Sequence, residues 1–109
     1  MANRYRGETT AVLDGKQWTL CLTLGALADL EQRFQVGDMS ALIDRFSRGT
    51  LSARDAIAII GAGLRGAGNS VDDDQVGRMT AKGGAAGFAE VVTDLLTVTF
   101  GEAETDDPS

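Results

Sequence analysis

The first pattern along the chain is a short alternation of apolar and polar residues, which is typical of strands with one buried face. It covers residues 8–23, and Asp14 and Gly15 at its centre favour a two-residue β-turn. That turn pairs Leu13 with Lys16 and places five apolar side chains on one face, opposite a mostly polar face: Ala11, Leu13, Trp18, Leu20 and Leu22. The segment predicts an antiparallel hairpin whose apolar face needs a cover of helices.

Beyond the hairpin, apolar residues recur every three or four positions, which is typical of amphipathic helices. Thr23 is a candidate N-cap for a first helix that ends before Gly37, with Leu27, Leu30 and Phe34 on one stripe. Asp38 is a candidate N-cap for a second, short helix that ends near Gly49 and carries Leu42, Ile43 and Phe46.

Three more helices follow. Ser52 with Asp55, and Asp72 with Gln75, have the spacing of capping boxes and predict helix starts near residues 53 and 73. The last helix, 85–100, has the most regular stripe: Phe88, Val91, Val92, Leu95 and Val98. The whole pattern predicts one α+β domain over residues 1–101, an N-terminal antiparallel β-hairpin packed against about five short helices. Residues 102–109, which carry no apolar residue larger than Ala, are expected to form an acidic disordered tail.

The segment "IAIIGAGLRG" (57–66) places Gly61, Gly63 and Gly66 at the spacing of a dinucleotide-binding fingerprint. That fingerprint requires a strand before the glycines and a helix after them. Here the capping signal at Ser52 comes first, so the sequence predicts a helix over residues 53–65. We therefore interpret the glycines as sites of close packing and helix termination, and we expect no bound cofactor.

Charge and composition exclude several classes of function. The 109 residues have a net charge of −6, and residues 72–109 hold nine acidic and two basic groups, a net of −7. Such a balance argues against nonspecific nucleic-acid binding. There is no histidine and Cys21 is the single cysteine, which argues against a zinc site and excludes a nucleophile paired with histidine. The sequence therefore predicts no catalytic, cofactor-binding or metal-binding residues.

Four other features have a functional and a structural interpretation. Asp72, Asp73 and Asp74 suit either a hard cation or a solvated helix N-terminus, and we favour the latter. Three arginines at 45, 48 and 54 suit either a phosphate site or a solvated helix face. Trp18 suits either an interface or the core, and we interpret Cys21 as inert.

Five segments together resemble one known family: "NRYRGE" (3–8), "LDGK" (13–16), "LTLGALADLE" (22–31), "LSARDAIAIIGAGLRGAG" (51–68) and "GGAAGFAEVVTDLL" (83–96). They are similar to the gene transfer agent tail protein family of alphaproteobacterial gene transfer agents and related prophages. The resemblance covers roughly residues 3–101, and its members are described as tail assembly chaperones or tail-tube proteins.

The resemblance implies a non-enzymatic tail assembly chaperone that binds the tape-measure protein and other tail proteins. It also leaves open a structural tail-tube or tail-completion subunit that is retained in the particle, and self-association. The candidate client-binding residues on exposed helix faces are Leu42, Phe46 and Met79, and a core position suits each of them at least as well. Without a secretory signal or a long apolar run, we expect a cytoplasmic protein with no membrane partner, and the acidic charge argues against a nucleic-acid partner. The resemblance implies that the protein is present transiently on assembling tails.

Overall fold

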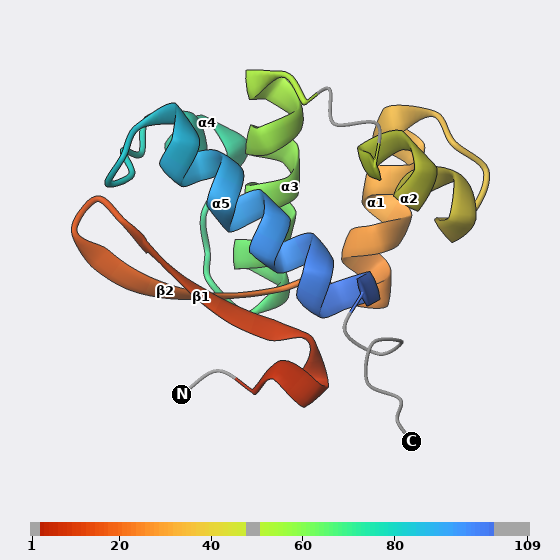
Figure 1. Ribbon diagram of the computed structural model, residues 1–109, viewed down its shortest axis with the longest axis horizontal. Coiled ribbons are helices and arrows are strands. Elements are labelled where there is room, and N and C mark those ends of the chain that lie inside the picture. Colours follow the sequence, from red (N-terminus) through yellow and green to blue (C-terminus); the bar gives the residue numbers. More distant parts are fainter. Residues whose placement is uncertain (1–2, 48–50, 102–109) are drawn as a thin grey trace.

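A two-stranded antiparallel sheet and five α-helices make up the described part of the chain (Figure 1). The computed structural model describes residues 3–47 and 51–101, so the expectations for Arg48, Gly49 and the acidic tail lie outside the described residues. The elements are β1 (Glu8–Leu13), β2 (Lys16–Cys21), α1 (Leu24–Phe34), α2 (Met39–Ser47), α3 (Ala53–Gly66), α4 (Asp73–Gly77) and α5 (Ala85–Leu96). A 3-10 turn (Arg4–Arg6) precedes them and a π-helical turn (Thr97–Gly101) follows. The expected α+β class is confirmed.

The hairpin has the register that the turn dipeptide predicts. Leu13 pairs with Lys16 and Ala11 with Trp18, because Asp14 and Gly15 both adopt positive φ, at 56° and 72°. The predicted apolar face lies against the helices, where Leu13 and Leu20 are completely buried.

All four N-caps that the sequence predicts are present. In each, a side-chain oxygen accepts a hydrogen bond from a backbone amide three residues further on, as at Thr23, Asp38, Ser52 and Asp72. Asp55 and Gln75 complete the two capping boxes by accepting from the amides of Ser52 and Asp72. Local side-chain chemistry therefore fixes where α1, α2, α3 and α4 begin.

Two helix ends differ from the expectation. Helix α1 ends in a left-handed residue at Gln35, two positions before Gly37, because the Val36 amide reaches back to the Glu31 carbonyl at 3.0 Å. Val36 packs against the core, which ties down this turn. The last helix widens into a π-helical turn at Thr97 rather than continuing as α-helix.

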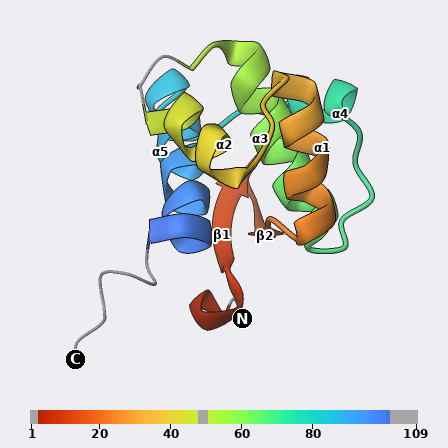
Figure 2. The same ribbon diagram turned by 90° about the vertical axis from the view of Figure 1, so that its right-hand side faces the viewer.

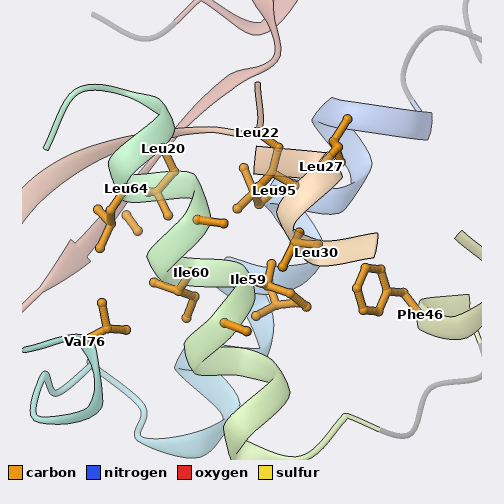
Figure 3. Packing of buried hydrophobic residues seen from close by; sticks show 14 of the residues in the cluster. Leu20, Leu22, Leu27, Leu30, Phe46, Ile59, Ile60, Leu64, Val76 and Leu95 are labelled. Carbon is orange, nitrogen blue, oxygen red and sulfur yellow. The ribbon is translucent and has the colours of Figure 1, made fainter. Parts of the chain in front are cut away.

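Helix α3 lies at the centre of the core (Figure 3). Its residues 58–64 are all buried, and Ile59, Ile60 and Leu64 are at most 1% exposed. Strand β2, α1, α4 and α5 all pack on it. This confirms the predicted helix over residues 53–65, so a strand does not precede the glycines as a dinucleotide fold requires.

The glycines of α3 permit close packing. A methyl group at Gly63 would lie 2.6 Å from Leu95 Cδ2, and one at Gly66 would overlap the Cys21 carbonyl oxygen. The close approach to a neighbouring backbone therefore occurs at Gly66, whereas Gly61 and Gly63 face side chains. Gly68, at φ 96°, supplies the left-handed residue after the helix, and the Asn69 amide bonds the Leu64 carbonyl at 3.0 Å.

A candidate protein-binding groove

An apolar groove lies between the N-terminal half of α3, α4 with the segment after it, and the first two turns of α5. Its volume is about 340 Å³. The lining is almost entirely apolar: Leu51, Ser52, Ala53, Ala56, Ile57, Ile60, Val76, Gly77, Met79, Ala85, Phe88, Ala89 and Val92. An open hollow with this lining is typical of a surface that binds an apolar group.

The depth of the groove follows from the sizes of its side chains. Ile60, Val76 and Val92 are nearly completely buried and form its floor. Ala85 and Ala89 on α5 are exposed and stop at a single methyl group, so they leave the space between the helices unfilled. A floor of branched residues between walls that include alanines therefore produces a hollow rather than a closed core.

The position of α4 depends on an ionic contact and on Gly61. The Asp73 carboxylate accepts from Arg33 of α1 and from Arg65 of α3, both at 3.0 Å. A methyl group at Gly61 would lie 2.6 Å from Asp73 Oδ1. The absence of a side chain at Gly61 therefore allows α4 to lie against α3 and form one wall of the groove.

The hairpin tip holds the segment that carries Met79. The amide and hydroxyl of Thr80 donate to Asp14 Oδ1 at 2.8 and 3.1 Å, and the Asp14 amide donates to the Thr80 carbonyl at 2.9 Å. Leu13 and Ala81 form an isolated antiparallel bridge beside this contact. The turn residue Asp14 therefore fixes one edge of the groove, a role that the hairpin pattern alone does not reveal.

Three basic residues are close in sequence to residues that line the groove. Arg54, Arg78 and Lys82 are exposed and stand within a few positions of Ala53, Met79 and Ala85. Arg78 contacts Asp74 at 3.4 Å, but both side chains are mostly exposed, at 75% and 85%, so solvent screens this pair. The exposed Glu90 likewise follows the lining residue Ala89, so exposed residues of both charges flank the lining in the sequence.

Two of the three residues expected to bind a client are not on the surface. Leu42 is completely buried and Phe46 is 8% exposed. Figure 3 shows the Phe46 ring directed toward the core, and it packs edge-on against Phe34 with ring centres 5.3 Å apart. These two side chains form the buried face of α2, which packs against α1. Met79 is partly buried and lines the groove.

Ile57 and Phe88 are groove residues that the sequence reasoning missed. Their helical periodicity assigns them to a buried stripe, and both do pack partly against the core. The remaining surface of each faces the groove. The sequence signal for this hollow is the alanine content of the same helix faces. Alanine is apolar enough to be buried but too small to fill the space between helices.

Apart from Arg54, the remaining charged candidates within the described residues have structural partners. Asp72 caps α4, Asp73 joins the two arginines and Asp74 lies beside Arg78. In the described ranges, three or more potential metal ligands do not gather at any point. Arg45 binds Asp55 at 3.1 Å and lies over the Phe34 ring, and Arg54 is exposed.

Trp18 and Cys21 also have structural surroundings. Trp18 is half-buried, its indole nitrogen donates to the Leu13 carbonyl at 3.1 Å and the Lys16 ammonium lies 4.4 Å from its ring centre. Burial raises the pKa of the Cys21 thiol, the Glu8 carboxylate raises it further and Arg6 opposes the rise. Neither residue lines the groove.

The described residues form a small α+β domain with an apolar groove on its surface. The chain belongs to the family described as "Phage tail tube protein, GTA-gp10", whose model matches residues 6–102. The expected membership in a gene transfer agent tail protein family is thereby confirmed. Among curated proteins and among solved structures, the chain has no significant match.

Membership in a phage tail family implies that the protein interacts with other tail proteins. Within the described residues, each helix is too short or too polar to cross a membrane.

Proposed function

We propose that this protein is a non-enzymatic tail assembly chaperone that binds a helix of the tape-measure protein in the groove between α3, α4 and α5. The observation that carries the proposal is the groove itself, an apolar hollow of about 340 Å³ on a protein of a tail family. A helix presents apolar side chains at every third or fourth position, which suits a groove with this lining.

The lining also suits reversible binding. Ile57, Met79 and Phe88 are partly buried before any client arrives, so a client covers only the apolar area that remains. Each Å² of that area contributes about 25 cal/mol, and ordering the client opposes it. A modest affinity fits a factor that releases its client before the tail is complete.

The distribution of charge supports the same role. The net charge of −6 gives copies of the protein a mutual repulsion that favours solubility. We place the protein in the cytoplasm of the host bacterium and transiently on assembling tails.

A second function, a tail-tube or tail-completion subunit retained in the particle, is favoured by the family description. A tube made from sheets needs strands that pair between neighbours. The described residues supply one hairpin, and the Asn69 side chain bonds the Thr19 carbonyl of β2, which blocks part of that edge. The geometry therefore favours the chaperone over this second function.

Mass spectrometry of purified particles separates the two functions. A chaperone is expected in at most trace amounts, whereas a ring of stoichiometric copies would establish the retained subunit instead.

Co-expression with the tape-measure protein tests the groove. Ala89→Trp places an indole in the groove, and its matched control, Ala86→Trp, places one at an exposed α5 position outside it. We expect wild type and Ala86→Trp to keep the tape-measure protein soluble and Ala89→Trp to fail. Equal solubility with all three, or no effect of the wild type, would contradict the proposal.

A further inference from the structure

The two residues at the tip of the hairpin, Asp14 and Gly15, form the dipeptide in which aspartate rearranges most readily to isoaspartate. That reaction needs a carboxyl group beside a main-chain nitrogen that no side chain shields, and glycine supplies such a nitrogen. Asp14 is the only aspartate or asparagine of the chain that precedes a glycine. Both tip residues are exposed, and no described residue other than the chain neighbours lies within 4 Å of a methyl group placed at Gly15. Solvent therefore reaches both reacting groups.

The rearrangement changes the main chain without an oxidant or a cofactor. The Gly15 nitrogen attacks Cγ of Asp14 and a C–N bond forms, while the hydroxyl of the protonated carboxyl group leaves as water with the Gly15 amide proton. Water then opens the resulting five-membered imide. Opening at Cγ restores aspartate, whereas opening at the main-chain carbonyl carbon routes the chain through Cβ and Cγ and leaves a free α-carboxylate. The isoaspartate product has an unchanged mass and one additional methylene in its main chain.

In the folded protein, Thr80 holds the Asp14 carboxylate by one of its oxygens. The amide and the hydroxyl of Thr80 donate to Oδ1 at 2.8 and 3.1 Å, and the Asp14 amide donates to the Thr80 carbonyl at 2.9 Å. Figure 2 shows both strands along the lower side of the helices, and in Figure 1 the tip, at the far left, lies beside the segment between α4 and α5. Ring closure turns Cγ toward the Gly15 nitrogen and removes one carboxylate oxygen, which both bonds to Oδ1 oppose. Thr80 therefore slows the reaction.

The modified tip no longer fits its surroundings. A two-residue turn places Leu13 opposite Lys16, and an additional methylene in the main chain disturbs this register. The free carboxylate is then attached to Cα rather than to Cβ, so it leaves its position beside Thr80. Because Thr80 directly follows Met79, which lines the groove, the product loses the contact that holds this edge of the groove.

We propose that Asp14 and Gly15 form a modification site at which isoaspartate arises spontaneously, and that Thr80 suppresses this reaction in the folded protein. The modified protein loses the contact between the hairpin tip and the segment that carries Met79. The inference does not depend on the proposed chaperone function, because the measurements that test it use the protein alone. Its consequence for a client is a groove whose edge loosens as the protein ages.

The rate of isoaspartate formation at neutral pH, followed by peptide mapping with electron-transfer fragmentation, tests the role of Thr80. Thr80→Val removes the hydroxyl donor and should react roughly fivefold faster than wild type, the change in population that one side-chain hydrogen bond typically makes. Thr80→Ser retains both donors and should react at the wild-type rate. Thr10→Val, at an exposed position of the same hairpin, is the matched control and should also react at the wild-type rate.

Unfolding in urea separates the effect of the folded contact from the intrinsic reactivity of the dipeptide. Unfolded wild type and unfolded Thr80→Val should react equally, and both should react faster than folded wild type. Circular dichroism verifies that each variant folds before incubation. Equal rates for folded wild type and folded Thr80→Val, or a folded wild type that reacts as fast as the unfolded chain, would overturn the proposal.

Hydrogen exchange of the modified fraction, separated by chromatography from the unmodified protein, tests the loss of the contact. The Thr80 amide, which donates to Asp14 in the unmodified protein, should exchange roughly tenfold faster or more in the isoaspartate form. Amides in the buried centre of α3 should keep their protection, which shows that the rest of the fold is intact. Unchanged protection of the Thr80 amide would overturn the proposal.

Discussion

The two halves of α3 face different surroundings although the same apolar pattern runs through both. The C-terminal half lies between β2 and α5, and its packing leaves no space for a methyl group at Gly63 or Gly66. The N-terminal half contributes Ala53, Ala56 and Ile57 to the wall of an open groove. An apolar stripe therefore indicates which side of a helix avoids water, but not whether its own chain or a partner covers that side.

The largest expected difference between the two halves of α3 is in the free energy of unfolding, and Leu64→Ala in the C-terminal half should lower it most. Leu64 is completely buried between β2 and the helices, so its truncation should lower the free energy of unfolding by about 3 kcal/mol. Ile57→Ala, at a partly buried groove position, should cost about half as much or less because solvent already reaches the site. Urea unfolding of both variants provides the comparison, and equal losses would indicate that the groove is as closely packed as the core.

Gly66→Ala tests the close contact between α3 and β2. The added methyl group overlaps the Cys21 carbonyl oxygen, a backbone atom that cannot rotate away, so we expect a loss of about 2 kcal/mol. The control is Gly77→Ala, where the methyl group would lie 3.5 Å from Ile57 Cδ1 in ordinary contact. Thermal unfolding should show little change or a small gain for this control, and a Gly66→Ala protein of wild-type stability would argue against the close approach.

Asp73→Asn tests how α4 is held against α3. The variant loses the charge that binds Arg33 and Arg65, and because these side chains are 31–53% exposed we expect a loss of only about 1 kcal/mol. Added salt should diminish the difference from wild type. Asp74→Asn removes a largely exposed pair with Arg78 and should not change stability measurably in the same denaturant series.

Cys21 should have the smallest effect on the free energy of unfolding, and this effect should appear as a dependence of stability on pH. Because its folded-state pKa is raised above the usual 9.0, the folded protein retains the thiol proton over a range in which the unfolded chain has lost it. The associated stability is present below the unfolded pKa and declines as pH rises toward the folded pKa. Cys21→Ser should remove this slope. Alkylation of Cys21 at neutral pH should also be slower than that of a free thiol, and equal rates would contradict the raised pKa.

Local signals in the sequence predicted the framework of the fold. The turn at Asp14 and Gly15 sets the hairpin register, and the N-caps at Thr23, Ser52 and Asp72 mark helix starts, because each depends on atoms within a few residues. The choice of helix over a dinucleotide-binding turn at residues 57–66 depends on the same local chemistry at Ser52.

The groove was not predictable, because it depends on contacts between distant segments. Thr80 binds Asp14 across 66 positions, and Asp73 binds Arg33 across 40. Leu42 and Phe46 were expected to bind a client from an exposed helix face, with a core position left open, whereas packing of α2 against α1 buries them and leaves Met39 and Ile43 exposed. Sequence patterns show that a helix has an apolar face, but only the arrangement of neighbouring helices shows what lies against it.

The most direct test of the account is a titration of the isotopically labelled protein with peptides from the helical regions of the tape-measure protein, followed by amide chemical shifts. We predict saturable shifts concentrated at the groove, around Ile57, Gly77, Met79 and Phe88, with no such shifts in the Ala89→Trp variant. Shifts centred on the outer face of the hairpin around Val12, or saturable binding that Ala89→Trp leaves unchanged, would contradict the account.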